Sequence, residues 1–524
     1  MEAELCCVCL DVLVVAGKSL FISSCGHSFH AACVIKASRH GHTNCPLCRK
    51  QIDEFTTLCP QTRGGNIFFQ EVRALSLSDA IVPVPLVGAD WAVRRVFQTE
   101  ASRVSLRAIP SVRAAQPNVP FDVLFEVNTV NPSNRRTPTD WVVLADSSGS
   151  MRGPKFDALL LTLHWMVDNM SRNDRMCLIS FHTSASVLCG FVSGEDAGKL
   201  LLHELLTALE PGGGTNVHAA VEKASMMLSR RLQRNPHASV LLISDGCTVA
   251  RPTDSPVTGM LRRMKHMATF NAVVLARNVP TNSEMHGYAA SCRGACTAVQ
   301  RPDELQRVVA ALVGAASYAL VRNLRVTVQG RSATFDAGTR VEGVYAGAPR
   351  YVGPYTFVCD DEGFYGNVGV SYERLPGDLN HHVVDPGPTY EHNDLVLKLP
   401  LGDSPAALED TLLICNHRNR KSVVHALKSA YFAATMGGTS SAVDVLEGEI
   451  ERLNGSIATN NAFTRVLKQD VSVALSAVKT VGGFEASGAD FAHAIYSHEH
   501  QRACGLSETR DALYATASVM NLIV

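Results

Sequence analysis

The sequence lacks an excess of charge of either sign. Its 524 residues contain 48 lysines and arginines against 49 aspartates and glutamates, which gives a formal net charge of −1 at pH 7. A near-neutral chain offers no general electrostatic attraction for nucleic acid or for an anionic membrane surface. We therefore expect neither as a partner.

The sequence also lacks the apolar runs that secretion and membrane insertion require. It begins Met-Glu-Ala-Glu, and an acidic start without an apolar stretch is unlike a signal peptide. The longest apolar run, residues 308–321, is too short for a membrane span and is typical of a buried helix. We therefore expect a soluble protein of the cytoplasm or nucleus.

Cysteine is unevenly distributed. Of the 16 cysteines, seven lie in the first fifty residues and the others are scattered singly. In a reducing compartment this pattern favours a metal site plus buried free thiols over a disulfide framework.

The length suggests roughly three to four domains, and apolar residues make up 46% of the chain, enough for each to bury a core. Composition and periodicity change several times along the sequence. The predicted order is a cysteine-rich finger at 1–50, a linker at 51–100, two β-strands at 101–136, an α/β domain at 137–320, an antiparallel β block at 321–416 and a helical region at 417–524.

Strands and helices alternate through the α/β segment. Helical spacing of apolar residues is found at 155–170, 217–232 and 305–320. Short apolar strands are expected at 141–145, 176–181, 240–244 and 271–275. This alternation predicts a doubly wound, mostly parallel sheet covered by helices on both faces.

Alternating β sequences flank this segment. Residues 104–109 and 121–127 precede it, and residues 324–328 and 395–399 follow it. They predict an antiparallel β-sandwich that brackets the α/β domain. Beyond it, apolar stripes at helical spacing predict C-terminal helices, the first of which ends at the glycine pair 437–438.

Eight cysteines and histidines at the N-terminus follow the spacing C-x2-C, C-x-H-x2-H-x2-C, C-x2-C. Eight such ligands make two closed tetrahedral Zn²⁺ sites, which stabilise a fold and do no chemistry on a substrate. A generic zinc ribbon is the alternative, and the order of eight ligands disfavours it. The ligands are Cys6, Cys9, Cys25, His27, His30, Cys33, Cys45 and Cys48.

This order and spacing resembles the RING-H2 finger, a family in which the ligand pairs interleave. Cys7 is left out because only Cys6 has the x2 spacing to Cys9. The resemblance implies one zinc held by Cys6, Cys9, His30 and Cys33, and a second held by Cys25, His27, Cys45 and Cys48.

The resemblance also implies a function. RING fingers act as ubiquitin ligases without a catalytic nucleophile, because they position a ubiquitin-charged conjugating enzyme for attack by a lysine of a protein substrate. The residues that match the family's docking positions are Val8, Pro46 and Arg49, the last at the linchpin position. Many members carry tryptophan where this sequence has Ala37, which indicates a shallower groove and leaves the choice of conjugating enzyme open.

The α/β segment carries a second group of polar residues. A D-x-S-x-S loop follows the first strand, a threonine follows a glycine run before a helix, and an aspartate ends the third predicted strand. Ligands of open α/β sheets bind at such strand ends, and these oxygen donors suit Mg²⁺, Mn²⁺ or Ca²⁺. The residues are Asp146, Ser148, Ser150, Thr215 and Asp245.

These motifs resemble the von Willebrand A domain and its metal-ion-dependent adhesion site. In that family the open coordination position of the ion takes an acidic residue of a partner. The alternative is an A domain whose loops persist without using a metal.

A RING-H2 finger followed by an A domain resembles the plant ubiquitin ligases of the wavy-growth type, with supporting stretches at 39–41, 150–155 and 234–239. This resemblance implies a ligase that recruits its target through the A domain or the regions behind it. The alternative is a metal-dependent protein-binding scaffold whose finger is structural only.

Other histidines and cysteines give weaker signals. The triplet His498-Glu499-His500 is interpreted as an exposed polar patch, and the pair His381-His382 as part of a loop. Cys292 and Cys296 are interpreted as buried thiols, because no second pair accompanies them.

Overall fold

The computed structural model describes residues 5–13, 20–23, 25–30, 32–34, 37, 44–50, 55–63, 66–74, 103–130, 136–231, 234–235, 237–246, 257–276, 284–317, 319–330, 334–335, 340–341, 344–345, 349–358, 364–374, 390–399, 402–480, 483–501 and 503–514. The chain forms two compact units. One comprises Met1–Phe97, Pro138–Val309 and Asp378–His382, and the other comprises Gln98–Thr137, Ala310–Gly377 and Val383–Val524.

Two strands of the N-terminal finger and two strands that follow it form an antiparallel sheet in the order β2-β1-β3-β4. Its strands are β1 (Leu20–Ser23), β2 (Ser28–His30), β3 (Phe55–Arg63) and β4 (Asn66–Ala74). Phe21 and Phe29 are buried in the finger, with ring centroids 6.4 Å apart. Strands β3 and β4 lie in the segment 51–100, where the sequence shows no sustained period and a linker was expected.

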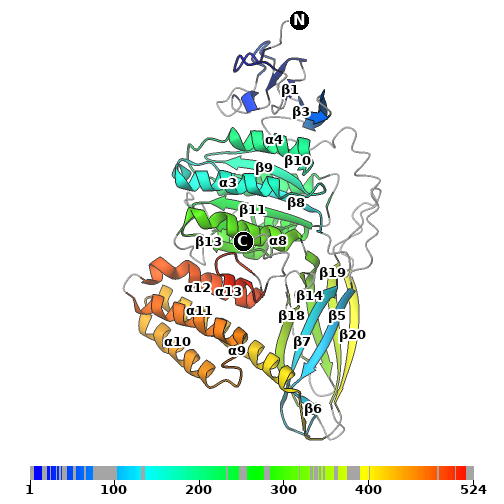
Figure 1. Ribbon diagram of the computed structural model, residues 1–524, viewed down its shortest axis with the longest axis vertical. Helices are drawn as coiled ribbons and strands as arrows, with labels where there is room; N and C mark the ends of the chain where they lie inside the picture. Colours follow the sequence, from blue (N-terminus) through cyan, green and yellow to red (C-terminus); the bar gives the residue numbers. More distant parts are fainter. Residues whose placement is uncertain are drawn as a thin grey trace. The chain divides into compact units, whose positions relative to one another are not determined.

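The α/β domain is built on a six-stranded sheet in the order β10-β9-β8-β11-β12-β13 (Figure 1). All neighbouring strands are parallel except β10, which runs antiparallel to β9 at the edge. This confirms the predicted doubly wound α/β fold. The strands are β8 (Thr139–Asp146), β9 (Arg175–Phe181), β10 (Ala185–Ser193), β11 (His237–Ser244), β12 (Thr269–Val274) and β13 (Cys296–Ala298).

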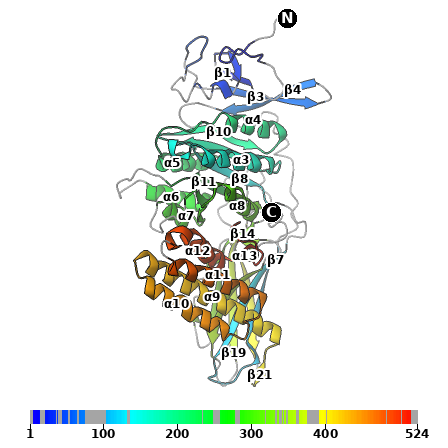
Figure 2. The same cartoon turned by 60° about the vertical axis from the view of Figure 1, so that its left-hand side comes forward.

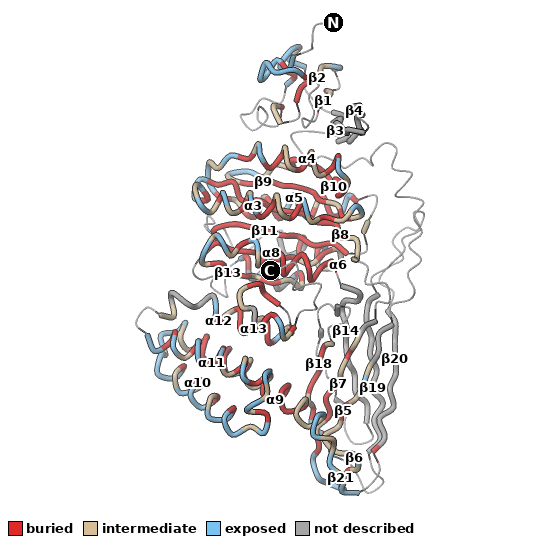
Figure 3. Tube along the Cα trace, viewed as in Figure 1, coloured by how far each residue is buried: buried red, intermediate tan, exposed pale blue. Residues whose placement is uncertain are grey.

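Helices cover both faces of this sheet. Every residue of β8 and β11 is buried, which requires cover above and below, and Figure 3 shows these strands in red. Helix α8 ends three residues before the predicted limit because β14 begins at Ala319. The helices are α3 (Pro154–Asp168), α4 (Asp196–Thr207), α5 (Val217–Ser229), α6 (Val257–Met267), α7 (Glu284–Ser291) and α8 (Leu305–Ser317).

The second unit contains antiparallel sheets from both sides of the α/β domain in sequence. One sheet has the order β18-β7-β5, in which Phe121 on β7 is paired with Phe357 on β18. The other has the order β15-β14-β19-β20, and β16 and β17 also pair with β14. A small pair, β21-β6, completes the set. The strands are β5 (Arg103–Pro110), β6 (Val112–Ala114), β7 (Phe121–Val130), β14 (Ala319–Gly330), β15 (Thr334–Phe335), β16 (Arg340–Val341), β17 (Val344–Tyr345), β18 (Arg350–Phe357), β19 (Phe364–Arg374), β20 (Tyr390–Leu399) and β21 (Ser404–Pro405).

The same unit ends in a group of helices (Figure 2). As predicted, the first ends at the glycine pair: Gly437 has a φ of 80°, and the Gly438 N–H donates to the Ala433 carbonyl at 2.8 Å. The predicted apolar stripes meet in one core around Leu427, Leu446 and Leu467. The helices are α9 (Leu408–Thr435), α10 (Thr439–Asn454), α11 (Ala462–Lys479), α12 (Gly483–His500) and α13 (Glu508–Asp511).

Candidate metal centres

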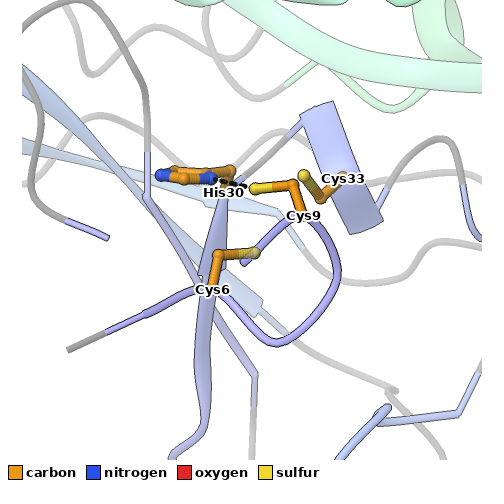
Figure 4. A group of neighbouring side chains, drawn as sticks. All are labelled: Cys6, Cys9, His30 and Cys33. Atoms are coloured by element: carbon orange, nitrogen blue, oxygen red, sulfur yellow. Dashed lines mark hydrogen bonds between the residues drawn. The ribbon is translucent and has the colours of Figure 1, made fainter. Parts of the chain in front are cut away.

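The finger brings Cys6, Cys9, His30 and Cys33 together, with one ligand atom of each lying within 4.8 Å of the others (Figure 4). The His30 Nδ1 lies 3.2 Å from the Cys9 Sγ, and the His30 Nε2 lies 3.0 Å from the Val12 carbonyl. A proton on Nε2 donated to that carbonyl leaves Nδ1 free to bind a metal. Such outer hydrogen bonds commonly fix the tautomer of a histidine ligand.

A second cluster has the same composition. Cys25, His27, Cys45 and Cys48 also place their ligand atoms within 4.8 Å of one another. The His27 Nδ1 lies 3.3 Å from the Cys25 Sγ and 3.5 Å from the Cys45 Sγ. The structure thus groups the eight ligands in the two sets that the family resemblance implies.

Each cluster offers three thiols and one imidazole, a donor set that fits a closed tetrahedral zinc site. The exposed Cys7 lies outside both. The two C-x2-C turns have the same backbone form. The Leu10 N–H donates to the Cys6 carbonyl at 2.7 Å, and the Arg49 N–H donates to the Cys45 carbonyl at 2.8 Å. Both donors have positive φ, 64° at Leu10 and 61° at Arg49.

The predicted oxygen site of the α/β domain forms around two buried aspartates. Asp146 ends β8, and its carboxylate accepts hydrogen bonds from the Ser148 N–H at 2.8 Å and from the Ser244 hydroxyl at 2.5 Å. Burial raises the pKa of Asp146, and the charge of nearby Asp245 acts in the same direction. A cation at this position would relieve both effects.

The serine hydroxyls connect the two aspartates. The Ser148 Oγ lies 3.0 Å from the Ser150 Oγ, and the Ser150 hydroxyl donates to the Asp245 Oδ1 at 3.1 Å. Four of the five predicted residues are therefore linked in one hydrogen-bonded chain from Asp146 to Asp245.

The fifth predicted residue, Thr215, is buried next to a glycine run tied to the D-x-S-x-S loop. The Gly149 N–H donates to the Gly213 carbonyl at 3.0 Å, and the Gly212 N–H donates to the Ser147 carbonyl at 2.8 Å. Gly213 has a φ of 75°, and a Cβ there would lie 2.9 Å from the Thr183 hydroxyl, so this turn favours glycine. With two carboxylates and the hydroxyls of Ser148 and Ser150 in one hydrogen-bonded group, the donor set would suit a hard divalent cation.

Comparison with known proteins identifies the two domains that contain these residues. The family model for the Ring finger domain matches residues 4–49, and the model for the von Willebrand factor type A domain matches residues 141–248. The chain carries a RING finger and an A domain.

Two curated relatives are similar to parts of this chain. The E3 ubiquitin-protein ligase WAVH1 of Arabidopsis thaliana is 21% identical over 298 residues, which cover 46% of this chain and 42% of the relative. The E3 ubiquitin-protein ligase WAV3 of the same plant is 30% identical over 118 residues, which cover 22% of this chain and 16% of the relative. The chain therefore spans less than half the length of these relatives.

Among solved structures, a von Willebrand factor type A protein from Catenulispora acidiphila matches with a TM-score of 0.49 and 12% identity, covering 73% of this chain and 91% of that one.

None of the helices in the described ranges combines the length and hydropathy that crossing a membrane requires.

The turns of the RING finger expose apolar side chains. Val8 in the first turn is 42% exposed, and Pro46 and Arg49 of the second are also exposed. Leu47, which the sequence pattern did not single out, is 56% exposed between Cys45 and Cys48. Its position matches that of Val8 between Cys6 and Cys9. The equivalence of the two turns could therefore have identified Leu47 from the sequence.

Lys155 of the A domain was also missed. It stands in the first turn of α3, and its ammonium lies 2.9 Å from the Asp245 Oδ2. Nothing in the local sequence indicates this contact, because the two residues are 90 positions apart.

The interpretation of His498 as part of an exposed patch is wrong. Its side chain is fully buried on α12, with Nδ1 2.7 Å from the Tyr514 hydroxyl and Nε2 2.8 Å from the Asp470 carboxylate. Cys292 is buried as expected, and burial raises its pKa to about 11, whereas Cys296 is only partly buried. His381 and His382 lie outside the described residues.

Proposed function

We propose that this protein is a RING-type E3 ubiquitin-protein ligase. The observation that best supports the proposal is the pair of Cys/His clusters in a finger whose turns expose apolar side chains. With four protein ligands each, two zinc ions have no open position for a substrate, so zinc would fix a docking surface and do no bond chemistry.

The docking surface would receive a ubiquitin-charged conjugating enzyme. Val8 and Leu47 offer apolar contacts, and Pro46 stiffens the second turn. The planar guanidinium of Arg49 is suited to bond ubiquitin and the enzyme together. The amine of a substrate lysine then attacks the thioester: the amide bond forms, the C–S bond breaks, and the thiol of the conjugating enzyme leaves. The finger's contribution is to hold the charged enzyme in position for this attack.

The A domain would bind the protein substrate or another partner. Its two buried carboxylates and three hydroxyls suit Mg²⁺, Mn²⁺ or Ca²⁺. Such an ion supplies an open coordination position for an acidic side chain of the partner. The protein's own part is to hold the oxygen donors at the strand ends, where a partner can reach them.

An autoubiquitination assay of the zinc-loaded full chain with a panel of conjugating enzymes tests the ligase proposal. Ubiquitin chains with at least one enzyme, and their loss in Cys45→Ala, are expected because removing one ligand opens a closed site. Absence of chains with every enzyme would contradict the proposal.

A metal-dependent binding scaffold is the second candidate. It is favoured by Ala37, a small half-buried residue where many RING fingers carry tryptophan. Capture of a partner that needs both Mg²⁺ and Asp146, without ubiquitin transfer, would select this function over the first.

We also propose a cytoplasmic or nuclear location in a plant cell. Buried free thiols such as Cys177 and Cys189 are typical of proteins kept in a reducing compartment. Imaging of a fluorescent fusion would test this, and export to the cell surface would contradict it.

A further inference from the structure

The oxygen site of the A domain already contains a positive charge. The Lys155 ammonium lies 2.9 Å from the Asp245 Oδ2, while the Ser150 hydroxyl donates to the Oδ1. The Asp245 side chain is completely buried, whereas that of Lys155 is 39% exposed. Both oxygens of a proposed metal-site carboxylate are thus engaged by the protein itself.

The helix offers no reason for a lysine at this position. Lys155 follows Pro154, the first residue of α3, so it stands at the positive end of the helix dipole. Cations are disfavoured there and acidic residues such as Asp157 are preferred. What favours the lysine is the buried carboxylate across the loop, since an isolated buried charge is costly.

We propose that Lys155 is an internal cation of the A-domain site, which holds Asp245 when no divalent ion is bound and weakens the binding of one. A divalent ion at Asp146, Ser148 and Ser150 must either displace the ammonium or bind beside it. Both routes reduce its affinity, because like charges a few ångströms apart repel strongly in a partly buried site. The inference rests on the proposed metal-dependent role of the A domain and is independent of ligase activity.

Charged and neutral variants at position 155 should differ in their affinity for Mg²⁺. Lys155→Gln should raise the affinity of the full chain for Mg²⁺ by at least about tenfold, because it removes a repelling unit charge from the site. Lys155→Arg keeps the charge and should bind Mg²⁺ as weakly as the unchanged protein. Lys199→Gln is the matched control, since Lys199 on α4 donates to the backbone carbonyl of Asp168 and lies outside the site.

Isothermal titration of each zinc-loaded full-length variant with Mg²⁺ alone measures these affinities. Thermal unfolding gives a second readout: without Mg²⁺, Lys155→Gln should unfold at a lower temperature than the unchanged protein, and Mg²⁺ should raise that temperature more in the variant. The second readout also shows whether the variant is folded.

Two results would overturn the inference. If Lys155→Gln bound Mg²⁺ no more tightly than the unchanged protein, Lys155 would not control the site. If no variant bound Mg²⁺, the proposed metal-dependent role would fall as well. Autoubiquitination by the unchanged protein reports separately on the proposed ligase function.

Discussion

At the scale of single residues, Arg49 links the backbone of the finger to the proposed function. It has a φ of 61° in the turn that contains Cys45 and Cys48, and its side chain is exposed. Arg49→Ala keeps the Cβ and hence the same backbone strain. We expect unchanged zinc content and a loss of roughly tenfold or more in ubiquitin transfer, since a charge-assisted hydrogen bond contributes about 1.5–3 kcal/mol.

Discharge of a ubiquitin-charged conjugating enzyme to free lysine measures this loss. Lys50→Ala is the control, because it removes the neighbouring exposed charge while leaving Arg49 in place. An Arg49→Ala protein that transferred ubiquitin at the full rate would remove this residue from the docking surface.

His417 makes the stability of the second unit depend on pH. Burial and the neighbouring Arg420 hold its pKa well below the usual 6.5. The Arg420 Nε donates to its Nδ1 at 3.2 Å, and its ring stacks on Tyr351 with centroids 4.1 Å apart. The folded state therefore keeps the imidazole neutral as the pH falls, while the unfolded state takes up a proton. His417 therefore leaves the free energy of unfolding unaffected above about pH 6.5. Below that pH it lowers the free energy of unfolding by up to about 1.4 kcal/mol per pH unit.

We expect His417→Gln to lose less stability than the unchanged protein between pH 7 and pH 5, as measured by urea unfolding at each pH. His498 contributes with the same sign, since burial lowers its pKa too, so the variant should retain part of the dependence. His425→Gln, at an exposed position on the same helix, is the control. Equal pH dependence in His417→Gln and the unchanged protein would contradict the assignment.

The site residues that could be predicted from the sequence were those with a characteristic local spacing. The eight zinc ligands and the D-x-S-x-S loop are close in sequence, so their spacing alone carried the signal. The contacts of Lys155 with Asp245, and of His498 with Asp470, join different elements of the fold. They depend on packing that no short pattern encodes.

At the scale of elements, the buried strands were predictable and the edge strands were not. Strands β8 and β11 are buried along their whole length and read as continuous apolar runs. Strand β13 has only three residues, and β10 is an edge hairpin strand with two register shifts. Neither sustains a period long enough to be recognised.

The close packing of β12 against the turn before β13 leaves no room for a side chain at Gly294. A Cβ on Gly294 would lie 1.8 Å from the Phe270 carbonyl oxygen, a backbone atom that cannot move independently. We expect Gly294→Ala to lower the free energy of unfolding of the A domain by roughly 1–3 kcal/mol or more. Gly287→Ala is the matched control: it lies exposed in α7 with nothing within 4 Å of its Cβ, so alanine should stabilise the helix by about 0.5–1 kcal/mol.

Urea unfolding of both variants measures the difference. Equal stability of the two alanine variants would mean that the turn before β13 relaxes freely.

At the scale of the whole molecule, the A domain is inserted into the sequence of the second unit. Strand β7 precedes it and β18 follows it, yet the two strands share a sheet. The Thr137 N–H donates to the Ser317 carbonyl at 2.6 Å, which joins the chain entering the A domain to the chain leaving it. Alternation predicted β7 but not β18, and strand register across so long an insertion is set by tertiary packing.

The finger and the A domain draw their candidate metal ligands from separate parts of the chain, and this separation gives the last prediction. The second zinc cluster draws its ligands from residues 25–48, whereas the oxygen site of the A domain draws its donors from residues 146–245. Cys45→Ala should lose one of two zinc ions and all ubiquitin transfer, because an opened site no longer holds its part of the finger. Binding of Mg²⁺ by the A domain should be unchanged.

Zinc content, autoubiquitination and Mg²⁺ titration of the same preparation measure all three quantities. Cys7→Ala is the matched control, since that exposed thiol belongs to neither cluster and its loss should leave two zinc ions and full transfer. Loss of Mg²⁺ binding in Cys45→Ala would show that the finger and the A domain fold as one cooperative body. Retained Mg²⁺ binding is expected because each site takes its donors from its own part of the chain.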